Sequence, residues 1–231
     1  MRHLLLVTRY MKYFIANWKA NKNLNETQSW VTEFLKQNLV LNGVKIIICP
    51  SFPLISPLKK MLEKQTIMSV GSQDVSIFEG GTYTGEVTAH NLESLAEYAI
   101  IGHSERKKNF HETDEQVKIK YTLAKKYGIE PIYCIANPDI SYPSDIQFLC
   151  YEPPEAISKG DGRGNFASID SILEAKRKLQ LKPQTQFIYG GSVNKDSVNS
   201  YLKSNEIDGF LIGGASLDPI HFYQIISSYL S

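Results

Sequence analysis

Short apolar runs alternate along the chain with stretches whose apolar residues recur at the spacing of an amphipathic helix. The runs are rich in isoleucine, valine and aromatic residues, which favour buried strands. We interpret eight of them as strands, at residues 13–17, 45–49, 68–71, 99–102, 130–135, 147–151, 186–189 and 209–212. Regular alternation of strands with helices predicts a parallel sheet covered by helices.

Helix signals fall between most of these strands. Asn25 and Thr113 are predicted N-caps, because a glutamine follows each of them at the third position and completes a capping box. Ser168 is a further predicted N-cap, and Gly128 is a C′ glycine that ends a helix. The predicted helices cover residues 26–35, 54–62, 91–98, 114–127, 169–179, 194–203 and 219–230.

The order of these elements predicts one (β/α)8 barrel, or TIM barrel, spanning residues 1–231. The polar stretch 137–145 holds two prolines and has no room for a full helix, so we expect the helix after the fifth strand to be shortened or absent. The alternative is a doubly wound open sheet. That fold favours a glycine-rich turn after the first strand, where this chain has Asn17-Trp18-Lys19.

Composition narrows the class of protein. A net charge of +1 gives no electrostatic case for nucleic-acid binding, and no apolar run approaches the roughly 20 residues of a membrane span. Cys49, Cys134 and Cys150 lie at or within apolar runs, so we expect buried free thiols, which suit a reducing cytoplasm.

The apolar run among the first ten residues is too short for the hydrophobic region of a signal peptide. We expect residues 1–11 to form a loose N-terminal extension, with Met11 as the alternative start.

Candidate catalytic side chains follow the predicted strands. In a (β/α)8 barrel the active site lies at the carboxyl ends of the strands. The first strand ends in Asn17, closely followed by Lys19. The fourth is followed by His103 and the sixth by Glu152. Each residue alone could be structural, but the barrel would bring an ammonium, an imidazole and a carboxylate to one face.

The surroundings of Glu152 suggest a general base. Pro153 and Pro154 follow it and favour an extended backbone at the strand's end. The segment 155–164 then contains three glycines and no helical pattern. A fixed carboxylate beside a mobile segment is typical of a base under a closing lid. The alternative is a glutamate that caps a strand beside an ordinary surface loop.

Glycine pairs follow the last two predicted strands. Gly190-Gly191-Ser192 and Gly213-Gly214 occupy the two loops where barrels often bind phosphate through backbone N–H groups. Either pair alone could serve only to turn a tight corner; together they favour a phosphate site.

The histidines divide into one candidate and several others. His103 opens a helical turn, where the helix N-terminus disfavours a cationic ring, so we expect a neutral hydrogen-bond donor. His111 has no second histidine four residues on, and a zinc site there has little support. We expect the remaining histidines to be structural or exposed, namely His3, His90 and His221.

Several motifs resemble those of the triosephosphate isomerase family and span residues 16–217 in the family's order. They are Ala16-Asn17-Trp18-Lys19, Tyr83-Thr84-Gly85-Glu86-Val87, Ile101-Gly102-His103-Ser104-Glu105-Arg106, Tyr151-Glu152-Pro153, Tyr189-Gly190-Gly191-Ser192-Val193 and Asp208-Gly209-Phe210-Leu211-Ile212-Gly213-Gly214-Ala215-Ser216-Leu217. The resemblance implies interconversion of dihydroxyacetone phosphate and glyceraldehyde 3-phosphate without a metal or a cofactor. The family is itself the standard example of a glutamate base paired with a neutral histidine.

The resemblance also implies a role for each residue. Glu152 would move the proton between the substrate carbons, His103 would shuttle protons on the oxygens, and Lys19 would hold the anionic substrate. Supporting roles are implied for Asn17 at the carbonyl oxygen, Glu105 beside Lys19, and Ser158, Ser192, Gly213 and Gly214 at the phosphate. The loop around Thr84 resembles the family's dimer loop, which implies a homodimer, or a tetramer as the alternative.

The sequence departs from the family's usual motifs at several positions, and two alternative functions remain open. Pro153-Pro154-Glu155 and Ser158 change the usual lid, and Ala136-Asn137 stands where a Gly-Glu pair is usual. One rival is another barrel enzyme acting on a sugar phosphate, which would need metal ligands or a second acid at the strand ends. The other is a non-catalytic relative, which would be expected to lack at least one of the three central side chains.

Overall fold

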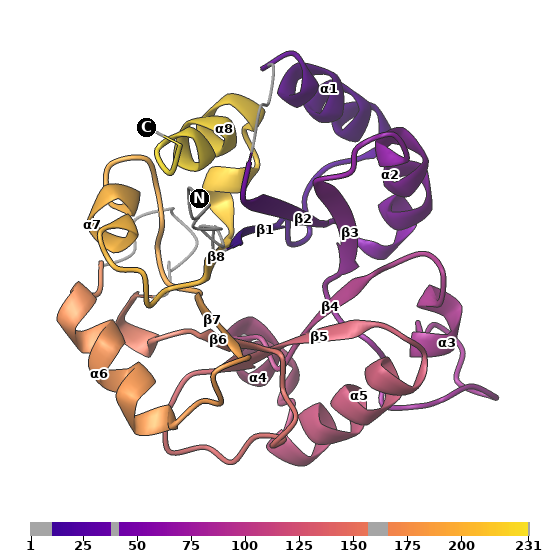
Figure 1. The fold of residues 1–231 in the computed structure, drawn as a ribbon. Helices are drawn as coiled ribbons and strands as arrows, with labels where there is room; N and C mark the ends of the chain where they lie inside the picture. The colour runs from indigo at the N-terminus through magenta and orange to yellow at the C-terminus, as the bar shows by residue number, and fades with distance from the viewer. Residues whose placement is uncertain (1–10, 38–41, 157–165, 231) are drawn as a thin grey trace, which may run out of the picture.

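The computed structural model describes residues 11–37, 42–156 and 166–230. Eight parallel strands pair in chain order and close into a barrel, as predicted, so the open doubly wound sheet is excluded (Figure 1). The strands are β1 (Lys12–Asn17), β2 (Val44–Cys49), β3 (Met68–Ser72), β4 (Tyr98–Ile101), β5 (Glu130–Ile135), β6 (Phe148–Tyr151), β7 (Gln186–Tyr189) and β8 (Gly209–Ile212).

Helices surround the barrel and connect the strands (Figure 1). They are α1 (Leu24–Leu35), α2 (Ile55–Leu62), α3 (Ala89–Leu92), α4 (Ser104–Phe110), α5 (Asp114–Lys126), α6 (Ile169–Leu179), α7 (Val198–Leu202) and α8 (Pro219–Ser227). Thr113 and Ser168 cap α5 and α6 as predicted, and Gly128 takes a positive φ of 70° beyond α5. Residues 136–147 between β5 and β6 contain no helix, which confirms that expectation.

Several predicted helix boundaries are wrong, at the start of α1, at both ends of α3, at the start of α7 and at the end of α8, which comes at Ser227 and not at residue 230. Helix α1 is capped by Asn23 and not by Asn25, since Glu26 completes a capping box with Asn23 and carries a charge that favours the helix N-terminus. Helix α3 starts after Thr88, and Tyr98 belongs to β4, where it pairs with Glu130. Residues 194–197 stay outside α7 because the Asn194 side chain accepts two backbone N–H bonds in a turn.

The core has two layers. Alternate strand residues fill the inside of the barrel, and the others pack outward against the helices. All three cysteines lie inside the barrel, buried and unpaired, as predicted. Burial raises the pKa of each of these thiols. Where the helix after β5 is missing, Ile146 is buried in the outer layer and Tyr142 packs against it.

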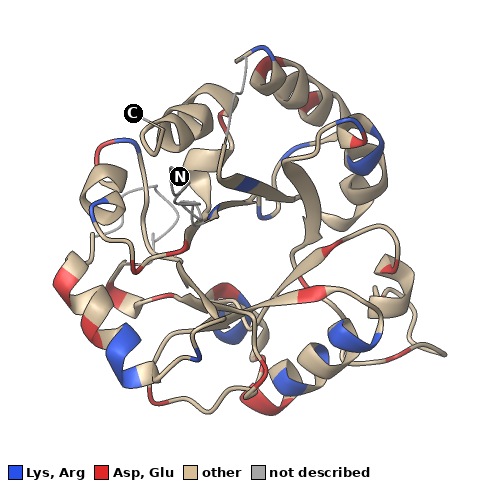
Figure 2. Ribbon diagram, viewed as in Figure 1, with Lys and Arg blue, Asp and Glu red and all other residues tan. Residues whose placement is uncertain are grey.

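Charges are spread over the outer helices. Figure 2 shows charges of both signs on α5 and α6, with acidic residues in the first turn of each helix and basic residues in its last turn. Within the described residues, no helix has both the length and the apolar character needed to cross a membrane.

Candidate active site

The three central side chains meet in one cavity at the carboxyl ends of the strands. Lys19, His103 and Glu152 line a cavity of about 520 Å³. Five other predicted residues line the same cavity: Asn17, Glu105, Ser192, Gly213 and Gly214. Ser158 lies outside the described residues. The predicted convergence is therefore present in the geometry, while the role of each residue remains a prediction.

Glu152 directly follows β6 and is only 2% exposed. Its backbone N–H donates to Ile135 O at 2.8 Å, which fixes its position at the rim. Its carboxylate accepts the Ser104 backbone N–H at 2.9 Å and lies 3.0 Å from His103 Nε2. Gly190 leaves room for this side chain, since a Cβ there would lie 2.8 Å from Glu152 Cγ. The carboxylate is thus held in a fixed position with little exposure to solvent.

His103 is the N-cap of α4. Its Nδ1 accepts the Glu105 backbone N–H at 3.2 Å. A ring nitrogen that accepts a hydrogen bond carries no proton, so the neutral ring carries its proton on Nε2. That nitrogen is the one that faces Glu152. The backbone of α4 therefore selects the tautomer that can donate toward the cavity.

Lys19 occupies a strained backbone position. Its φ is 52°, a left-handed conformation that is uncommon for a lysine. Its N–H donates to Asn17 Oδ1 at 3.1 Å, and its carbonyl accepts Gln73 Nε2 at 2.8 Å. Its ammonium is hydrogen-bonded to Glu105. Two neighbouring side chains thus hold the backbone of Lys19, and a carboxylate holds its charged end.

Gln73 is a site residue that the sequence analysis missed. Its amide nitrogen also donates to Cys49 O at 2.9 Å, so it ties the end of β2 to the loop after β1. The available signal was its place immediately after β3, at the same rim as the other site residues.

The proposed phosphate end lies between the last two strand ends. Gly213 packs close to Lys19, since a Cβ there would lie 3.1 Å from Lys19 Cε. Ser192 donates both its N–H and its hydroxyl to Ala156 O, each at 2.9 Å. Binding of phosphate by Ser192 therefore requires this pair of bonds to be exchanged.

Further cavity residues were not predicted. His221 was expected to be structural or exposed, yet it is half-buried and lines this cavity from the first turn of α8. Asn21, Phe166 and Asn194 are among the other lining residues that were not predicted. Their positions in the sequence did not indicate a place in the cavity, because they lie in loops and helix starts beyond the strand ends and reach the cavity only through the fold.

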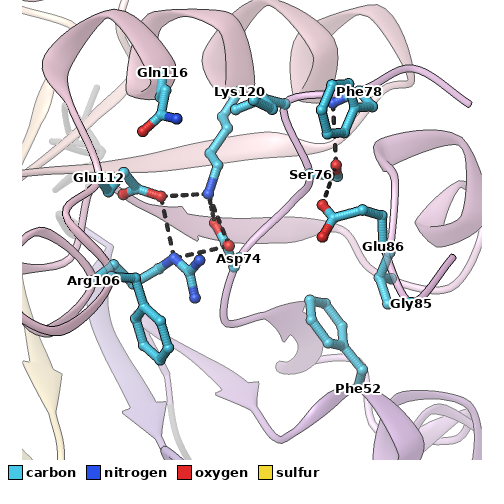
Figure 3. Close-up of a pocket in the computed structure, with 13 residues that line it drawn as sticks. Phe52, Asp74, Ser76, Phe78, Gly85, Glu86, Arg106, Glu112, Gln116 and Lys120 are labelled. Atoms are coloured by element: carbon cyan, nitrogen blue, oxygen red, sulfur yellow. Dashed lines mark hydrogen bonds and ion pairs between the residues drawn. The ribbon is translucent and has the colours of Figure 1, made fainter. Parts of the chain in front are cut away.

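A second cavity of about 370 Å³ lies beside the loop that follows β3 (Figure 3). Four charged side chains form a cluster on its wall: Asp74, Arg106, Glu112 and Lys120. The Asp74 carboxylate accepts Lys120 Nζ at 2.6 Å and Arg106 Nε at 2.9 Å. Burial raises the pKa of Asp74, and the charge of Lys120 opposes that rise.

Replacement of Lys120 by methionine should destabilise the fold strongly. The variant would leave two carboxylates buried against a single guanidinium, and loss of one partner from a buried ion pair costs about 3–5 kcal/mol. Urea unfolding followed by circular dichroism measures this cost. A free energy of unfolding within 1 kcal/mol of the original protein, by the same order-of-magnitude scale, would contradict a stabilising role for the cluster.

The described residues contain no group of three His, Cys, Asp or Glu side chains arranged to hold a metal ion. Glu112, beside His111, pairs with Lys120 and Arg106 instead.

Comparison with known proteins assigns the chain to a family. A family model described as triosephosphate isomerase matches residues 12–148 and 143–229. The chain is 33% identical to the triosephosphate isomerase of Mesomycoplasma hyopneumoniae strain 232, over 93% of this chain and 98% of that protein. It is 32% identical to the enzyme of Dictyoglomus thermophilum, over 94% and 99%, and 33% identical to that of Aquifex aeolicus, over 93% and 98%. The chain belongs to the triosephosphate isomerase family.

Proposed function

We propose that this chain interconverts dihydroxyacetone phosphate and D-glyceraldehyde 3-phosphate by proton transfer through an enediolate. The observation that carries the proposal is the meeting of Glu152, His103 and Lys19 in one cavity, with the first two only 3.0 Å apart. No step of this reaction requires a metal or a redox cofactor.

Glu152 is the base in this mechanism. A proton on carbon next to a carbonyl is weakly acidic, so its removal needs a carboxylate that is poorly solvated and well placed. The carboxylate of Glu152 is buried and rests on His103 and the Ser104 N–H in this structure. Substrate entry exchanges these contacts for contacts with the substrate carbons.

His103 and Lys19 act on the substrate oxygens. The Nε2 proton of His103 is donated to the carbonyl oxygen and passed between the two oxygens. Lys19 stabilises the negative charge that develops on the enediolate, where preorganised charge is most effective. Asn17 Oδ1 is engaged by the Lys19 N–H, so its Nδ2 is the group that can polarise the carbonyl.

The phosphate lies against the last two strand ends. The backbone N–H groups of Gly213 and Gly214 bind its oxygens, with Ser192 joining once it leaves Ala156. The same geometry argues against another sugar-phosphate enzyme that uses two acids, because Glu105 is already paired with Lys19.

An isomerase assay on the purified protein tests the proposal. Glyceraldehyde 3-phosphate formation is coupled to its dehydrogenase, and the reverse reaction to glycerol-phosphate dehydrogenase. We expect turnover in both directions, unaffected by a metal chelator. A folded protein without turnover in either direction would favour the non-catalytic alternative.

We also propose a homodimer in which the loop around Tyr83 and Thr84 of one copy enters the second cavity of the other. Tyr83 is 44% exposed and stacks on Phe78 at 3.6 Å, while Phe110 on the cavity wall is 66% exposed. In addition, Glu112 Oε2 is buried without a hydrogen-bond partner at this cavity. Exposed aromatic rings beside a carboxylate oxygen without a hydrogen-bond partner fit an interface. The buried free cysteines suit a cytoplasmic protein.

Light scattering should give about twice the chain mass of 26.1 kDa at micromolar concentration. Thr84→Arg adds a bulky charge at the loop tip and should shift the protein toward monomer and lower its activity. A matched Thr122→Arg on the exposed face of α5 should leave the mass unchanged. Monomer in the unaltered protein would contradict the proposal, and four chain masses would indicate the tetramer.

A further inference from the structure

Tyr201 joins two segments that are distant in the sequence. It lies on α7 and is 1% exposed. Its hydroxyl donates to Ala167 O at 3.0 Å, across 34 residues. Ala167 immediately precedes Ser168, the N-cap of α6. The carbonyl of Ala167 is therefore held by Tyr201, and the backbone that follows it is held by the start of α6.

The ring of Tyr201 has a fixed position. It packs against Tyr189 of β7 with ring centroids 4.9 Å apart, and against Phe210 of β8 at 6.3 Å. These two strands carry the glycine loops of the phosphate end. The hydroxyl of Tyr201 therefore ties Ala167 to the same part of the barrel that positions Gly190–Ser192 and Gly213-Gly214.

Phe166 is the neighbour of Ala167 and lines the active-site cavity together with Ser192 and Asn194. It is nevertheless 52% exposed, so few contacts of its own hold the ring there. Its placement thus depends on the backbone at Ala167. An apolar ring at this position keeps water from the phosphate end, where a lower dielectric strengthens the attraction between backbone N–H groups and an anion.

We propose that Tyr201 is a positioning residue for phosphate binding, acting through Ala167 and Phe166. This inference rests on the proposed function in that the bound anion is taken to be the substrate's phosphate. The bond between Tyr201 and Ala167 does not involve Glu152, His103 or Lys19. Loss of this bond should therefore weaken phosphate binding and leave the chemical step intact.

The test compares two tyrosine-to-phenylalanine variants that each lose one hydroxyl bond to a backbone carbonyl. In Tyr201→Phe the lost bond is the one to Ala167. In the control, Tyr142→Phe, it is the bond to Leu179 at the end of α6, away from the cavity. We expect KM to rise roughly three- to tenfold in Tyr201→Phe, which is the size of one hydrogen bond, with kcat within about twofold. Tyr142→Phe should leave both constants unchanged.

Binding of inorganic phosphate, measured by calorimetry, separates this inference from the proposed function because it needs no turnover. Its dissociation constant should rise by the same factor in Tyr201→Phe only. In a Phe166→Ala background, Tyr201→Phe should have no further effect on phosphate affinity. Equal effects in the two tyrosine variants, a loss of kcat rather than affinity, or full additivity with Phe166→Ala would overturn the proposal. If the unaltered protein bound phosphate but had no isomerase activity, the proposed function would be overturned and the inference about Tyr201 would not.

Discussion

Glu152→Gln is expected to lower kcat by roughly 10²–10⁴-fold, the usual contribution of a positioned base, and to leave KM within a few-fold. The amide keeps the size of the side chain and can still occupy the site beside Ser104, but it cannot accept a proton from carbon. Glu152→Asp keeps the charge and withdraws the carboxylate by one methylene, so it should also reduce turnover sharply. A misplacement of about 1 Å can cost on the order of 10²-fold.

Steady-state kinetics in both directions measures these effects. Glu115→Gln is the matched control, since Glu115 is exposed on α5. It should behave as the unaltered protein. If Glu152→Gln retained full turnover, Glu152 would not be the base. If KM rose while kcat stayed constant, its role would be in substrate binding instead.

The strands were the most predictable part of the fold, because each is a short apolar run between polar segments. The predicted bounds of β5, β7 and β8 agree with the structure at both ends. Helix starts were less predictable where two capping signals compete. Around α1, both Asn23 and Asn25 have a suitable partner three residues on, and only Asn23 forms the box. Such a choice depends on a few tenths of a kcal/mol to about 1 kcal/mol, below what a sequence pattern resolves.

The central site residues were predictable for a topological reason. Parallel strands in a closed barrel all end at one face, so residues at those ends converge whatever their distance in the sequence. Gln73 and Tyr201 act instead through side-chain bonds to backbone carbonyls 54 and 34 residues away. No periodicity encodes such contacts, because they depend on how the loops and helices pack around the barrel.

Lys19→Met is the second large expected effect. The ammonium is the only positively charged group among the described residues that line the cavity, apart from any charge carried by its histidines. Loss of a group that stabilises developing charge reduces kcat by roughly 10²–10³-fold. Because Lys19 also attracts the anionic ground state, KM should rise by roughly tenfold or more, the size of a charged hydrogen bond. The combined loss in kcat/KM is therefore roughly 10³-fold or larger.

The structure predicts a second loss of substrate affinity in Lys19→Met. Glu105 would lose its ammonium partner and become an uncompensated carboxylate near the phosphate end, where it repels the substrate. Lys19→Met with Glu105→Gln should therefore bind substrate better than Lys19→Met alone while kcat stays low. Lys118→Met on the exposed face of α5 is the control for loss of one positive charge.

Kinetics of the three variants distinguish the role of charge from the role of backbone shape. The left-handed backbone at Lys19 is held by Asn17 and Gln73 through backbone atoms, which methionine retains. The loop should therefore keep its conformation, and the losses should come from the missing charge. If Lys19→Met lowered kcat/KM by less than about tenfold, well short of the expected contribution of a charge-stabilising group, the enediolate would have to be stabilised by His103 and Asn17 alone.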